Sequence, residues 1–147
     1  MPLLHDAAFR EASKNRLRAL RPDATRHWGQ MSIDQMLWHV NGGLENALGR
    51  FPVAPVRVPL PKSLMKVAVF YLPWGKGKTP TAPELVAKGT HDFEQERDKL
   101  FRLIDEFSAK SIEGTWGDSA FLGPMRGRDW SRLMAKHVDH HLRQFGV

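Results

Sequence analysis

The sequence predicts an all-α protein, a four-helix bundle in which residues 1–147 form a single domain. Three observations support this class. Four long stretches place apolar residues on one helical face, no stretch alternates between apolar and polar residues as a strand does, and prolines or glycines separate the stretches. With 147 residues, 41% of them hydrophobic, the chain is long enough to bury a core.

The first helix is expected over about residues 6–20, where Phe9, Leu17 and Leu20 share a face. It ends before Pro22, because the residue that precedes a proline disfavours the α conformation. Arg16 lies inside this apolar stripe. Its side chain either extends along the surface to reach solvent or serves as an anion-binding group at the mouth of a pocket.

The second helix is expected to begin after Ser32, which has the spacing of a capping box with Gln35, and to run to about Leu48. His39 falls at the edge of its apolar arc. The pair Gly42-Gly43 stands in mid-helix, where each glycine costs about 1 kcal/mol relative to alanine. We therefore expect another group to approach the backbone closely at this point.

Residues 49–90 form a proline-rich insertion between the second and third long helices, with a short helix over about 62–72. The third long helix is expected over about 90–108 and the fourth over about 127–145, joined by a glycine-rich loop. Glu96 borders the apolar arc of the third helix and is the one candidate for a general base. The alternative is that its charge at a helix edge is simply solvated.

Composition narrows the function classes. The chain has no cysteine, which excludes disulfides, cysteine-ligated metals and a thiol nucleophile of its own. Its formal net charge of +6 is compatible with nucleic acid, but the basic residues are scattered and argue against that partner. The N-terminus lacks the features of a signal peptide, and no apolar stretch is long enough to span a bilayer. A cytoplasmic location without a membrane partner is expected.

The C-terminal stretch RDWSRLMAKHVDHHLRQFGV, residues 128–147, carries a histidine pair with the spacing H-x-x-x-H. His137 and His141 fall about 40° apart on the apolar face of the helix, so their nitrogens can converge on one metal ion. Val138 replaces the glutamate of the metalloprotease pattern H-E-x-x-H. The alternative is a pair of buried histidines bonded to neighbours. His39 is the candidate third ligand, and three histidines leave a coordination position open.

The segments RLRALRPDATRHWGQMSIDQMLWHV (residues 16–40) and DWSRLMAKHVDHHLRQFGV (residues 129–147) resemble the DinB/YfiT-like superfamily of metalloenzymes. The resemblance implies an up-down-down-up bundle that often forms homodimers. It also implies a divalent metal ion, Zn, Ni or Fe, held by His39, His137 and His141. One departure is Ser119-Ala120 before Phe121, where relatives often carry His-Pro.

Three functions are compatible with these features. The first is a metal-dependent hydrolase or a thiol-dependent S-transferase acting on a small molecule, with an external small thiol because the chain has no cysteine. The others are a non-catalytic binding module and a nucleic-acid-associated protein. Gln144 is expected to orient a ligand histidine, and Trp38, Trp28 and Trp130 are candidates for a pocket wall.

Overall fold

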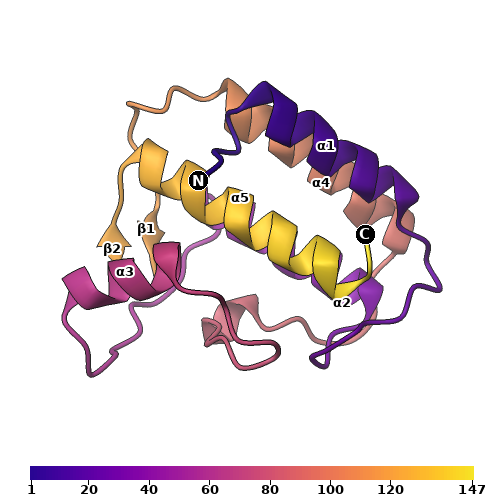
Figure 1. Ribbon diagram of the computed structural model, residues 1–147, viewed down its shortest axis with the longest axis horizontal. Coiled ribbons are helices and arrows are strands. Elements are labelled where there is room, and N and C mark those ends of the chain that lie inside the picture. Colours follow the sequence, from indigo (N-terminus) through magenta and orange to yellow (C-terminus); the bar gives the residue numbers. More distant parts are fainter.

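The computed structural model describes residues 1–147 and shows a mostly helical chain (Figure 1). The five α-helices are α1 (Ala7–Ala19), α2 (Ile33–Ala47), α3 (Lys62–Tyr71), α4 (Phe93–Ala109) and α5 (Gly127–Gln144). A short 3₁₀ helix, η1 (Pro83–Leu85), precedes α4, and two strands, β1 (Asp118–Ser119) and β2 (Gly123–Pro124), precede α5. The predicted helical class is confirmed. No helix combines the length and the apolar character that crossing a membrane requires.

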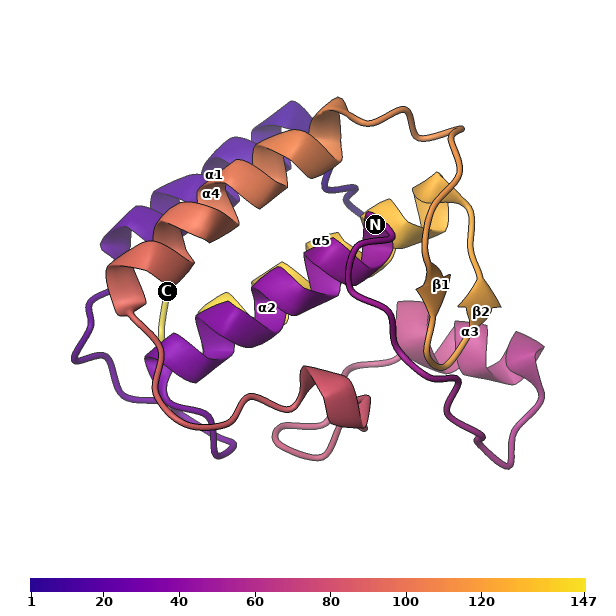
Figure 2. The ribbon, with the colours of Figure 1, turned by 180° about the vertical axis from the view of Figure 1, so that it is seen from behind.

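The four long helices surround the core. Helix α2 packs against α4 and α5, and α1 packs against the same two helices. Two opposite views show α1 beside α4 and α2 beside α5 (Figures 1 and 2). Their apolar faces meet in one cluster whose fully buried members include Leu37, Leu44, Ile104, Phe107 and Met134. Because α2 and α5 are neighbours, residues on their facing sides can share one site.

The expectation that the chain contains no strands is wrong in the loop between α4 and α5. There β1 pairs with β2 in a two-stranded antiparallel ribbon. Each strand has only two residues, too few for an alternating pattern to appear in the sequence. Gly123 has a positive φ of 68°, which glycine adopts without steric cost.

The N-terminus of α2 is fixed by side-chain hydrogen bonds. The backbone N–H of Ser32 donates to Oε1 of Gln35 at 3.1 Å, as the capping box predicts. The Asp34 carboxylate accepts the backbone N–H of His91 at 2.8 Å. This second bond attaches the end of the proline-rich segment to the first turn of α2.

Among the helices, α3 packs only against α5 (Figure 1). Nζ of Lys136, on α5, donates to the backbone oxygens of Val69 and Leu72 at 2.7 Å and 2.6 Å. These bonds satisfy carbonyl groups at the end of α3, where the oxygen of Val69 also accepts from Nε1 of Trp74 at 2.9 Å. Lys136 thereby attaches α3 to the helix that carries the histidine pair.

Candidate metal centre

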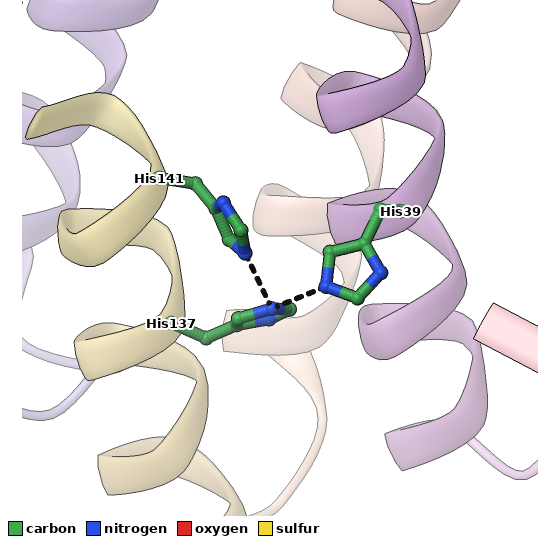
Figure 3. Close-up of side chains that lie close together, drawn as sticks. All are labelled: His39, His137 and His141. Carbon is green, nitrogen blue, oxygen red and sulfur yellow. Dashed lines mark hydrogen bonds between the residues drawn. The ribbon is translucent and has the colours of Figure 1, made fainter. Parts of the chain in front are cut away.

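Three histidines from two helices point toward one another (Figure 3). His39 comes from α2, and His137 and His141 come from successive turns of α5. Nε2 of His137 lies 2.9 Å from Nε2 of His39 and 3.1 Å from Nε2 of His141. One nitrogen from each residue falls within 4.8 Å of the others, an arrangement that could hold a metal ion. The structure therefore brings together the three residues singled out in the sequence.

The outer nitrogens of two of these rings are fixed by hydrogen bonds. Nδ1 of His39 lies 2.7 Å from the carbonyl oxygen of Leu85, which only accepts. Nδ1 of His141 lies 2.8 Å from Oε1 of Gln144, whose Nε2 donates to the carbonyl of Trp28 at 2.8 Å. Both Nδ1 atoms must therefore carry the proton, which leaves an unshared electron pair on both Nε2 atoms.

The arrangement of donors fits a divalent cation. Nε2 of His137 stands between the two unprotonated nitrogens, and a proton on it can be directed at only one of them. The other pair of nitrogens then lies about 3 Å apart with no hydrogen bond between them, and a cation at the centre would give all three nitrogens a partner. Hydrogen bonds from the far side of two rings are the usual support of metal-ligating histidines.

Burial keeps these imidazoles neutral, which is the form that binds metals. Burial lowers the pKa of His137 well below its usual value, and the nearby His141 and His39 lower it further. Burial likewise lowers the pKa of His141 to about 3. The pKa of His39 is also lowered by burial, although its bond to Leu85 offsets part of the effect.

The two mid-helix glycines of α2 make room for this arrangement. A Cβ atom on Gly43 would lie 3.2 Å from Cε1 of His137, and one on Gly42 would lie 2.8 Å from Cδ2 of Leu85. Gly43 thus admits a ring of the cluster, and Gly42 admits the residue whose carbonyl holds His39. The close approach expected from the sequence is confirmed at both positions.

The cluster opens onto a cavity of about 540 Å³. Two tryptophans and a fourth histidine also line this cavity. The ring of His140 is 5.7 Å from that of Trp28 and 5.5 Å from that of Trp74. Trp74 also lies 6.0 Å from the ring of His137. No aspartate, glutamate, lysine or arginine lines the cavity. Its walls are therefore uncharged.

Some of the other predicted site residues also belong to this region. Gln144 is buried, and its Oε1 lies 2.8 Å from Nδ1 of His141. Trp28 and Trp130 line the cavity. Ser119 and Ala120, which stand where relatives often carry His-Pro, line it as well.

Three predicted residues do not line the cavity. Arg16 forms an ion pair with Asp139 at 2.8 Å, so it joins α1 to α5 instead of standing at the pocket mouth. Trp38 stacks on His91 at 5.4 Å. Glu96 accepts a hydrogen bond from Asn41 at 2.7 Å, between α2 and α4. As placed, none of the three is in contact with the histidine cluster.

Sequence reasoning missed Leu85 and Trp74, both in the proline-rich segment. Leu85 acts through its backbone carbonyl, for which its side-chain type gives no signal. Trp74 follows Pro73 in a stretch without periodicity, so its direction could not be predicted. The Gly42 position was the only indirect sign, because it required a close neighbour for α2.

Comparisons with known proteins identify the family to which the chain belongs. Neither a search of curated proteins nor a search of solved structures gave a match. The sequence model of the DinB superfamily, in contrast, matches residues 6–145, which include all the long helices and all three histidines. The chain therefore belongs to the DinB superfamily.

Proposed function

We propose that the chain binds a divalent metal ion through His39, His137 and His141 and uses it as an enzyme acting on a small molecule. The observation that carries this proposal is the pair of unprotonated Nε2 atoms flanking a third imidazole nitrogen beside an open cavity. The proposal includes the remaining expectations from the resemblance: an up-down-down-up bundle in one domain, with the proline-rich segment as an insertion.

Of the two reaction types expected from the sequence, S-transfer is better supported than hydrolysis. No carboxylate lines the cavity, so a water molecule there would find no acidic side chain to act as its general base. Glu96, the candidate for that role, is bonded to Asn41 on another side of α2. A metal ion, when bound, supplies Lewis acidity that lowers the pKa of a coordinated thiol. The chain has no cysteine, so the thiol would be an external one.

The residues of the chain would orient the metal ligands and limit access of water. Leu85 and Gln144 hold His39 and His141 with Nε2 turned inward. Trp28 and Trp74 flank His140 beside the cluster and reduce the space open to solvent. A thiol and its partner would therefore meet beside tryptophan rings in a cavity with no charged side chain in its wall.

Metal analysis tests the proposal. Protein purified without a nickel column, after incubation with Zn²⁺, Ni²⁺ or Fe²⁺, is expected to retain about one equivalent of metal. A His137→Ala variant should retain far less, because it loses the central nitrogen. Wild-type protein that binds less than about 0.2 equivalents after reconstitution would contradict the proposal.

A second measurement separates an enzyme from a non-catalytic binding module. Metal-loaded protein is incubated with small thiols and an electrophile, and loss of free thiol is followed. Turnover that disappears in His137→Ala supports S-transfer. A loaded protein that consumes no thiol with any acceptor favours the binding module.

We further propose a homodimer. The support is a group of apolar side chains that α3 and its flanks expose: Leu60, Leu64, Val67, Tyr71 and Leu72. Exposed apolar groups of this kind are common where proteins associate. Light scattering of the purified chain tests this, and a Leu64→Glu variant should be monomeric at concentrations where wild type is dimeric.

A further inference from the structure

The cavity is elongated along α5 and differs at its two ends. Seven residues of this helix line it: Trp130, Leu133, Met134, His137, His140, His141 and Gln144. From the first to the last of these positions the helix rises about 21 Å. The histidines and the glutamine occupy the C-terminal part of this span, and only apolar residues occupy the N-terminal part.

The wall opposite the N-terminal half of α5 is apolar too. Met65 and Val69 of α3 line it, together with Phe121 and Leu122 of the ribbon between the strands. Helix α3 packs against α5 at this end, where Lys136 holds it. A molecule extending from the histidines toward Leu133 would therefore contact hydrocarbon on both sides.

Several polar side chains that line the cavity are already bonded within the protein. Amide groups of Gln35 and Asn46 donate to the backbone oxygens of Gly89 and Phe51, at 2.8 Å and 2.9 Å. The hydroxyl of Thr79 donates to the oxygen of Gly75 at 3.1 Å. These donor groups are therefore engaged within the protein, whereas Gln30 and Thr81, which also line the cavity, are exposed.

Two lysines lie close to the cavity but do not line it. Nζ of Lys76 stands 4.9 Å above the ring of Trp28, and Nζ of Lys136 stands 5.1 Å above the ring of Trp74. Each tryptophan already has a cation against one face, so the pair is not an empty aromatic cage for a cationic ligand. Lys136 is also bonded to carbonyls of α3, so its charge is engaged there, and neither lysine lines the cavity.

We propose that the ligand is an uncharged molecule with one metal-binding head and an apolar tail. The head would bind at the three histidines, and the tail would lie along α5 toward Leu133, between α3 and the ribbon. A charged tail would be buried without a partner, at a cost that contacts with hydrocarbon do not offset. This inference rests on the proposed metal site and specifies its substrate class.

Binding of hydroxamic acids to the Zn²⁺-loaded full chain tests the inference by calorimetry. Affinity is expected to rise from acetohydroxamic to octanohydroxamic acid by up to about fourfold for each added methylene group. Suberic acid monohydroxamate has the same length as the octanoyl compound but ends in a carboxylate, and it should bind at least about 100-fold more weakly than that compound. Chain-length independence, or equal binding of the two long compounds, would overturn the inference.

A matched pair of variants tests where in the cavity the alkyl tail binds. Leu133→Trp should fill the apolar end and reduce the affinity for octanohydroxamic acid to that for acetohydroxamic acid, without changing zinc stoichiometry. Ala8→Trp adds the same ring at an exposed position of α1, outside the cavity, and should change neither affinity. If Leu133→Trp does not fold, Met65→Trp narrows the same end from the opposite wall. Octanohydroxamic acid that binds as tightly to the folded cavity variant as to wild type would place the tail elsewhere.

The metal measurement distinguishes the two proposals. A chain that binds no zinc fails the proposed function, and the inference fails with it. If the chain binds zinc and acetohydroxamic acid but its affinity does not rise with an alkyl tail, the proposed function stands and only the proposed substrate class is wrong.

Discussion

Gln144 determines which nitrogen of His141 faces the other histidines. Its amide donates to the carbonyl of Trp28, so its oxygen is the atom left to accept from Nδ1 of His141. Gln144→Leu removes that acceptor and frees the ring to rotate or change tautomer. We expect metal affinity to fall about 10- to 100-fold, as competition with a chromophoric chelator would measure.

Two variants control this residue-scale prediction. Gln144→Glu keeps an oxygen for Nδ1 of His141 and should retain most of the affinity. Gln30→Leu removes a glutamine that also lines the cavity but bonds to no histidine, and should leave affinity unchanged. Equal losses in Gln30→Leu and Gln144→Leu would show that Gln144 acts through general cavity polarity.

At the scale of helices and segments, Lys136 of α5 is bonded to three backbone oxygens at the end of α3 and so helps to hold α3 on α5. Lys136→Met keeps the apolar stem but loses the bonds to the last carbonyls of α3. We expect faster amide hydrogen exchange in α3, by about tenfold, because local opening becomes easier. Zinc stoichiometry should not change, because Lys136 bonds to neither Leu85 nor Gln144, the residues that hold His39 and His141. Lys62→Met, at an exposed position of α3, is the matched control, and similar exchange in both variants would contradict the prediction.

Asp34 provides a pH-dependent link between α2 and the proline-rich segment. Burial raises its pKa, but hydrogen bonds from Ser32 and from backbone N–H groups outweigh this and hold the pKa below its usual value. Because the folded-state pKa is the lower one, the contribution to stability is present above about pH 4 and is lost as the pH falls further. Asp34→Asn should cost about 1 kcal/mol of unfolding free energy at neutral pH and almost nothing near pH 2. Urea unfolding measures both, and Asp98→Asn, at an exposed position of α4, should show no such difference.

Periodicity was sufficient to predict the long helices and the inward side of two of the three histidines, but it did not predict the segments that surround them. The last helix was expected over about 127–145 and spans Gly127–Gln144, because about five turns of apolar spacing leave little freedom in its register. The inward direction of His137 and His141 followed from the same register. The direction of Glu96 did not, since a helix pattern shows which face is buried but not which neighbour covers it. The positions of Leu85 and Trp74 could not be predicted for a similar reason. Prolines interrupt the apolar periodicity of this segment, and they do not determine the direction of the chain that follows.

At the scale of the whole molecule, the triad joins helices that are distant in sequence, so metal binding should stabilise the entire fold. His39 and His137 are brought together only when α2 packs on α5. The unfolded chain lacks this convergence, and a ligand that binds only the folded state stabilises it by about 2.7 kcal/mol at a free concentration of about 100 times Kd. For a chain of this size, that corresponds to a rise of about 5–10 °C in Tm.

Thermal unfolding with Zn²⁺ and then with excess chelator measures this effect. The rise in Tm should reverse with chelator and be absent in His137→Ala. His27→Ala removes an exposed histidine outside the cluster and should retain the full rise. An equal rise in His137→Ala would mean that zinc stabilises the protein elsewhere. A rise that His27→Ala retains and His137→Ala loses would show that the histidines meeting between α2 and α5 couple metal binding to the folding of the whole bundle.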